Sequence, residues 1–197
     1  MTDPRTSAIT AALASMGADV VIRAGDENLI RSRQPGDPGE RPFVVIVEGL
    51  ANLLHEFVHI LLAGRLADDH GVDYQRIPFQ LAYDQDRRLL WEELACCQLS
   101  CAHLPGDEAD RDAWFLEQIG IQGVFFGVAG VADFIELVDG ARARWPGALE
   151  QEIARGAAAL ETALVAHGMT PEAARPTSAV PFAVRWQHAK NVRNLSG

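Results

Sequence analysis

The 197-residue chain has few cysteines and no long uninterrupted hydrophobic run. Its three cysteines, Cys96, Cys97 and Cys101, lie on one predicted helix, where neighbouring thiols are poorly placed to bridge. We therefore expect reduced thiols rather than a disulfide framework. The most apolar stretch, residues 50–66, includes two histidines, a glutamate and an arginine, whereas a membrane span needs about 18 apolar residues. The sequence thus predicts neither a disulfide scaffold nor a membrane protein.

Positive charge is also scarce, because 17 Lys and Arg residues stand against 27 Asp and Glu residues and leave a formal net charge of −10. Such a surface repels phosphate, so we expect no nucleic acid partner. The chain does not open on the apolar segment of a secretory signal, and together with reduced thiols this predicts a cytoplasmic protein. The share of hydrophobic residues, 48%, is that of a globular protein rather than a disordered one.

Basic residues gather only in the C-terminal tail, residues 170–197. This tail contains a single acid, Glu172, and four basic residues, which are Arg175, Arg185, Lys190 and Arg193. We expect the tail to be solvated, with docking on the acidic remainder of the chain or on a partner as the alternatives.

The hydrophobic pattern predicts an α+β fold that is mostly helical, with a small N-terminal sheet followed by helices. Expected strands lie at 19–23, 28–31 and 43–49, and expected helices at 6–16, 50–66, 87–104, 110–120, 124–145 and 148–167. We divide the chain into a core over residues 1–105, a helical portion over 106–169 packed on it, and the basic tail, all in one compact domain. The apolar positions of 125–138 are expected in the core or in a dimer face, so an oligomer is compatible with the sequence.

Residues 55–59 form an H-E-x-x-H sequence within the apolar helix expected over 50–66. His55 and His59 are one turn apart on the same face, so both imidazoles can bind one ion. Glu56 lies about 100° further round the helix, where it can contact a water on that ion without being a ligand. Polar side chains among apolar neighbours destabilise the fold unless they are paired or bind metal. The pattern therefore indicates a zinc ion (Zn2+) with Glu56 as general base.

A catalytic zinc needs a third protein ligand and an open position for water. The downstream candidates are Asp68, Asp69, His70, Asp73, Glu92 and Glu93. The first four lie in an irregular acidic loop, which we expect to be solvated. The last two lie in an apolar helix, where an unpaired carboxylate is unfavourable. We expect Glu92 to be the ligand, because the small Ala95 one turn later allows close approach of the histidine helix, and we keep Glu93 as the alternative.

With these residues the sequence resembles the gluzincin-type metallopeptidases, in which H-E-x-x-H on one helix is completed by a glutamate on the next. Within that group it is most similar to the ImmA/IrrE family of zincin-like metallopeptidases. The matching features are the strand at 43–47, the helix HEFVHILLAG and the E-x-x-A sequence at 92–95. The resemblance covers roughly residues 19–105 and implies a zincin-like core. It also implies zinc binding by His55, His59 and Glu92 and general base catalysis by Glu56.

Four further residues are secondary candidates. Cys96 is one turn from Glu92, so it could contact the metal, although a small buried hydrophobic residue is the more common role. Tyr74 and Tyr83 lie in or beside the loop between the two ligand helices, and a phenol there, Tyr74 first, could donate to a tetrahedral intermediate. His103 could stabilise an oxyanion if the end of its helix folds back, against the simpler reading of a capping or surface histidine.

Three functions remain compatible with these patterns. The first is a zinc metallohydrolase that cleaves an amide or peptide bond, with Glu56 taking a proton from water and passing it to the leaving amine. The second keeps the same site but acts on a small molecule, by amide hydrolysis, elimination or cyclisation. The third is a binding or regulatory module in which the metal is structural, with Cys96 or an acid of residues 68–73 as fourth ligand.

Overall fold

The structure, a computed structural model, describes residues 3–25 and 28–195. The chain forms two compact units. The N-terminal unit comprises the residues up to Val72 together with Arg155–Arg175, and the helical unit comprises Asp73–Ala154 together with the residues from Pro176 onward. This division differs from the expected boundaries at residues 105 and 169. The helix that contains Glu92 and Glu93 packs against the helix that follows it in the chain. It therefore belongs to the helical unit and not to the unit that contains His55 and His59.

A three-stranded sheet forms the centre of the N-terminal unit. Its strands are β1 (Ala18–Ile22), β2 (Leu29–Ser32) and β3 (Phe43–Val47), in the order β1-β3-β2. Strand β3 pairs in parallel with β1 and antiparallel with β2. Its β-branched residues from Val44 to Val47 are buried, as a central strand requires. The sequence-based strand predictions are confirmed to within about two residues at each end.

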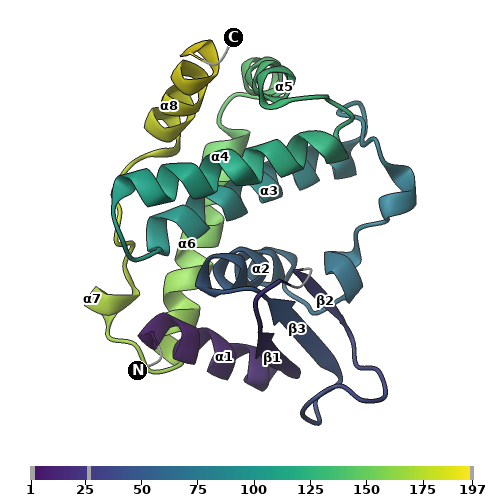
Figure 1. The fold of residues 1–197 in the computed structure, drawn as a ribbon, viewed down its shortest axis with the longest axis vertical. Coiled ribbons are helices and arrows are strands. Elements are labelled where there is room, and N and C mark those ends of the chain that lie inside the picture. The colour runs from purple at the N-terminus through teal and green to yellow at the C-terminus, as the bar shows by residue number, and fades with distance from the viewer. Residues whose placement is uncertain (1–2, 26–27, 196–197) are drawn as a thin grey trace. The chain divides into compact units, whose positions relative to one another are not determined.

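Two helices of this unit pack against strands of the sheet (Figure 1). Helix α1 (Pro4–Met16) packs against β1, and helix α2 (Leu50–Ala63) packs against both α1 and β3. Helix α2 is apolar nearly all round, and eight of its residues are buried. It ends at Gly64, whose φ of 69° lies in the left-handed region that glycine adopts without steric cost. The chain thus carries residues 55–59 in a largely buried helix.

Helices make up the helical unit. They are α3 (Asp84–His103), α4 (Glu108–Phe125), α5 (Val131–Arg144) and α8 (Phe182–Leu195), joined by the first residues of α6 (Ala148–Ala166). Helix α3 lies along α4, as Figure 1 shows, and α4 also contacts α5 and α8. The single helix expected over 124–145 is wrong, because Gly127 has a φ of 71° and the chain turns there before α5 begins. The short helix α7 (Pro171–Ala174) belongs to the N-terminal unit.

The basic tail is folded rather than solvated, apart from residues 196–197, which lie outside the described residues. Helix α8 docks on acidic side chains of the helical unit. Arg185 is fully buried and pairs with Asp112 and with Glu108, the latter at 3.0 Å between Nη2 and Oε2. Lys190 bonds Asp139 at 2.6 Å, and the Trp186 ring nitrogen donates to the same carboxylate at 2.8 Å. Docking on acids of the chain, the alternative to solvation, is therefore observed.

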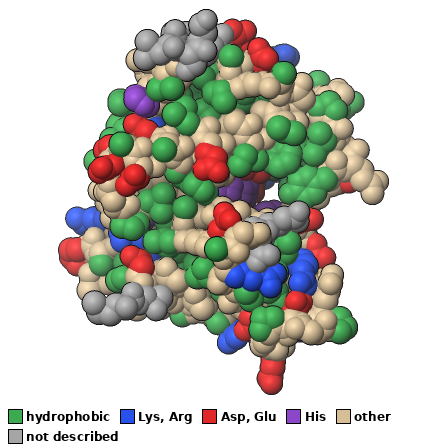
Figure 2. All heavy atoms as spheres, viewed as in Figure 1, with side chains coloured by type: hydrophobic (Ala, Val, Ile, Leu, Met, Phe, Trp, Pro, Cys, Tyr) green, Lys and Arg blue, Asp and Glu red, His purple; other side chains and the backbone are tan. Residues whose placement is uncertain are grey.

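The sequence predicted neither a membrane-spanning helix nor a disulfide framework. In residues 3–25 and 28–195, no helix is long and apolar enough to cross a membrane. The three cysteines are buried in α3 and form no disulfide among these residues. On the face drawn in Figure 2, acidic side chains are scattered among hydrophobic and uncharged ones and do not gather in one patch.

The apolar positions of 125–138 were expected in the core or in a dimer face. Phe126, Phe134 and Val138 are buried, which places them in the core.

We predict that the acids around Arg185 contribute more to stability than the arginine itself. Replacing both Asp112 and Glu108 with alanine leaves a buried guanidinium without its ion pairs, and should lower the free energy of unfolding by about 3–5 kcal/mol. Arg185→Met removes the buried charge and keeps apolar packing, so it should cost less than about 2 kcal/mol. Urea unfolding measures both. Glu117→Ala on the exposed side of α4 is the control, and a larger loss in Arg185→Met than in the double variant would contradict the prediction.

We also predict that the Asp139 interactions are sensitive to acid. Burial alone would raise the pKa of Asp139, but the hydrogen bonds from Lys190 and Trp186 outweigh it and lower the pKa below its ordinary value. The stabilising contribution is therefore complete above about pH 4 and is lost as the pH falls through the lowered pKa. The difference in melting temperature between wild type and Asp139→Asn should be constant near neutral pH and shrink below pH 4. A difference that persists at low pH would contradict this.

Candidate metal centre

Helix α2 places its two histidines next to each other inside the N-terminal unit. His55 and His59 are 6% and 3% exposed, and their Nε2 atoms are 3.2 Å apart. A tetrahedral zinc ion about 2.0–2.1 Å from each of two nitrogens would hold them about 3.3 Å apart. The pair thus has the spacing that a shared ion requires, as the i, i+4 spacing on an α-helix predicted.

Glu56 is held by a histidine from another part of the same unit. The Glu56 Oε2 atom lies 2.5 Å from the Nε2 atom of His70, and both side chains are largely buried. Burial alone would raise the pKa of Glu56, but the hydrogen bond from His70 and the charges of the neighbouring histidines lower it. A carboxylate ionised at neutral pH only accepts hydrogen bonds, so His70 Nε2 is the donor. Glu56 is therefore a buried anion, the state that a general base needs.

His70 was considered as a third ligand and expected to lie in a solvated acidic loop, and its contact with Glu56 was missed. It lies in a short 3-10 turn, η1 (Asp68–Gly71), in which Asp69 and His70 have φ values of 46° and 55°. Its ring stacks on that of His59, with 4.6 Å between ring centroids. Aspartate and histidine are among the residues that adopt positive φ more often than most, but no local sequence pattern identifies a contact with a side chain 14 residues earlier.

The third candidate ligand comes from α3, and the structure favours Glu93 over Glu92. From Leu90 to His103, Glu92 is the one residue that is not buried. It continues the more exposed stripe of Gln85 and Leu89, whereas Glu93 is 8% exposed. The buried group of two histidines and one glutamate, His55, His59 and Glu93, could hold a metal ion. The sequence carried no signal for this choice, because α3 is buried nearly all round from Leu90 onward and the two glutamates differ only in their burial.

No protein-family model, no curated protein and no solved structure matches the chain. The resemblance to ImmA/IrrE metallopeptidases therefore stays a prediction, and so does the zincin-like core.

The secondary candidates lie in the helical unit and have different surroundings. Tyr74 is 45% exposed and its ring is 5.8 Å from that of Phe125, so it contributes to packing. Tyr83 is more exposed still, at 55%. Cys96 is fully buried, as expected of a small hydrophobic residue. His103 is fully buried at the end of α3, ten residues and therefore about 15 Å along the axis from Glu93. This separation gives no support to a role for His103 beside a metal held by Glu93.

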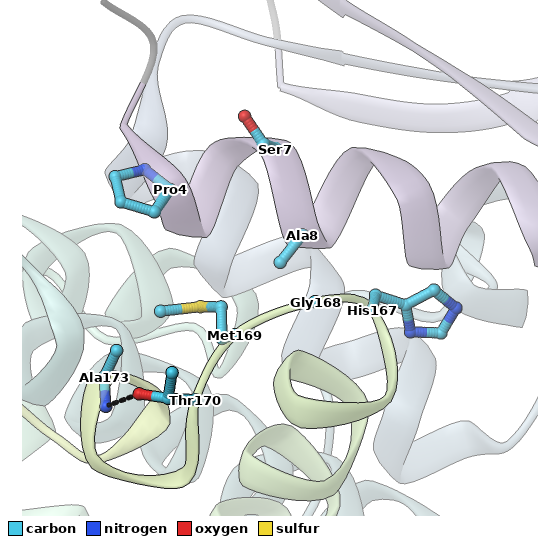
Figure 3. Close-up of a pocket in the computed structure, with 8 residues that line it drawn as sticks. All are labelled: Pro4, Ser7, Ala8, His167, Gly168, Met169, Thr170 and Ala173. Atoms are coloured by element: carbon cyan, nitrogen blue, oxygen red, sulfur yellow. Dashed lines mark hydrogen bonds between the residues drawn. The ribbon is translucent and has the colours of Figure 1, made fainter.

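A pocket of about 470 Å³ opens in the N-terminal unit between α1 and the segment after α6 (Figure 3). Its lining is largely apolar, and its one ionisable side chain is His167. Both ring nitrogens of His167 have partners, because Nδ1 lies 2.9 Å from the Ala163 carbonyl and Nε2 lies 3.2 Å from the Ser15 hydroxyl. The residues that line this pocket therefore include no cluster of ligating or acid–base side chains.

We predict that Glu93→Gln weakens zinc binding and that Glu92→Gln does not. The two variants make the same chemical change at adjacent positions of one helix, so each controls for the other. Loss of a direct ligand should lower zinc affinity at least as much as the roughly 10–100-fold that loss of an outer partner costs. Competition with a chromophoric chelator measures affinity, and elemental analysis measures bound metal. Weaker binding in Glu92→Gln alone would restore the sequence-based assignment.

Proposed function

We propose that the chain is a zinc-dependent hydrolase of amide or peptide bonds with a zincin-like site, in which His55, His59 and Glu93 hold the metal. The observation that carries the proposal is the buried His-His-Glu group with a carboxylate, Glu56, that follows the first histidine and is hydrogen-bonded to His70. Two imidazoles and one carboxylate are the ligand set of many catalytic zinc sites, and they leave a coordination position open. A non-catalytic structural site would instead use four protein ligands.

The donor set also favours zinc over other common ions. Calcium and magnesium prefer oxygen ligands in larger number, whereas imidazole nitrogen suits zinc and its transition-metal neighbours. When bound, the ion would supply positive charge that makes a water more acidic and polarises a carbonyl group. The protein supplies the buried surroundings that strengthen these electrostatic effects.

Glu56 has the role of proton carrier in this proposal. It is adjacent to His55 in the sequence and projects about 100° round α2 from it, so it does not share the ligand position. Its carboxylate accepts the hydrogen bond from His70 Nε2 at 2.5 Å and can accept a proton from water. Once protonated, it can pass this proton to the nitrogen that leaves when the amide bond breaks. The reaction class is therefore hydrolysis with one carboxyl group acting first as base and then as acid.

We predict that Glu56→Gln retains zinc and loses hydrolysis. The amide is nearly the same size as the carboxyl but cannot accept a proton, so the rate should fall by about 10²–10⁴-fold, the usual contribution of a general base. The assay incubates zinc-loaded protein with a mixture of unstructured peptides and detects new termini by mass spectrometry. Glu40→Gln, at an exposed glutamate of the N-terminal unit, is the matched control.

Two results would overturn the proposal. Undiminished cleavage by Glu56→Gln would show that another group takes the proton. A wild-type protein that binds no zinc would remove the metal from the mechanism altogether.

A further inference from the structure

The turn η1 carries a histidine whose contacts extend the site beyond the H-E-x-x-H residues. His70 reaches Glu56 through the 2.5 Å contact between its Nε2 and the carboxylate, with only 10% and 13% of the two side chains exposed. The same ring stacks on His59 at 4.6 Å. One side chain outside α2 thus contacts both the candidate general base and a candidate ligand.

The backbone around His70 is held in an unusual conformation. Asp69 and His70 are consecutive non-glycine residues in the left-handed region, where such residues are uncommon. Two backbone hydrogen bonds brace the turn, one from His70 N to the Ala67 carbonyl at 3.2 Å and one from Val72 N to the Asp69 carbonyl at 2.9 Å. A conformation of this kind persists only where the surrounding structure imposes it.

The sheet imposes it through Asp68. The Asp68 Oδ1 atom accepts from both the backbone nitrogen and the hydroxyl of Ser32, at 2.6 and 2.8 Å. Ser32 is the last residue of β2, so η1 is fastened to the edge of the sheet at its first residue. A continuous series of hydrogen bonds and short chain segments therefore connects β2 to the carboxylate of Glu56, all within the N-terminal unit.

We propose that His70 is a positioning residue that fixes the carboxylate of Glu56 for proton transfer, an inference that rests on the proposed function. The hydrogen bond occupies Oε2 and restricts rotation of the carboxyl group, so that Oε1 is the oxygen presented to water. The stack on His59 holds the plane of the imidazole ring. A base positioned in this way loses less orientational freedom when the reaction occurs.

Three substitutions separate the side chain from the backbone. His70→Ala removes the donor and keeps a Cβ in the left-handed region, whereas His70→Gly removes the donor and relieves that conformation. His70→Gln can place an amide N–H near the position of Nε2. His167→Ala removes a histidine of the same unit away from α2 and is the matched control.

The first readout needs no substrate. Protein labelled with ¹⁵N in histidine gives long-range ¹H–¹⁵N spectra in which a His70 Nε2 that donates to Glu56 is protonated, and its signal should shift in Glu56→Gln. A His70 signal that does not change in Glu56→Gln would overturn the inference.

Zinc affinity, measured with the metal alone, should change less than about twofold in the three His70 variants. A loss like that of a ligand variant would show that His70 binds the metal, and would also overturn it.

The second readout is peptide hydrolysis by the zinc-loaded variants. We expect kcat to fall by about 10–100-fold in His70→Ala and His70→Gly, with KM little changed and most of the rate restored in His70→Gln. Restoration by glycine rather than by glutamine would assign His70 a backbone role and reject positioning. If wild type binds no zinc or Glu56→Gln cleaves normally, the proposed function fails. If both behave as proposed and the His70 variants cleave like wild type, only the positioning role fails.

Discussion

Burial of polar side chains in an apolar helix is the constraint on which the rest of the structure depends. Eight residues of helix α2 are buried, the two histidines among them, so water does not solvate these histidines or the largely buried Glu56 well. Each polar group there needs a partner or an ion, because an uncompensated buried polar group costs several kcal/mol. The short distance between the His55 and His59 nitrogens and the bond from His70 to Glu56 both answer this requirement. A cation bound among these residues would offset the cost of burying their polar atoms, and the same atoms would then hold a catalytic ion.

The sequence predicted the elements that depend on local pattern. The apolar run of α2 and the β-branched run of β3 are each visible in a few consecutive residues, and their positions are confirmed to within a few residues. Helix α2 ends at Ala63, earlier than the expected residue 66. The pair of histidines follows from the helical period alone. Glu92 was preferred to Glu93 because of the small residue Ala95 one turn later, and the burial that distinguishes the two glutamates is seen only in the structure.

The remaining features depend on contacts between residues far apart in the chain. His70 meets Glu56 only because Asp68 is tied to Ser32, and no local pattern carries that information. Helix α8 was missed for a similar reason. It has a weakly amphipathic sequence, and the acids that hold it, Asp112 and Asp139, precede it by about 50–75 residues. The excess of acids in the composition is therefore partly used to bind the one basic stretch of the chain.

The segment 155–175 completes the N-terminal unit after the helical unit has been started. Its Arg155 donates to the Leu62 carbonyl at 2.8 Å, while Arg5 near the start of the chain donates to the carbonyls of Ala173 and Arg175 at 2.9 Å. During synthesis, the sheet and α2 emerge from the ribosome about a hundred residues before these partners. The N-terminal unit, which contains α2, can therefore be completed only after residues 155–175 have been synthesised. A fragment that ends near residue 105 would contain the H-E-x-x-H residues but lack this segment of their unit.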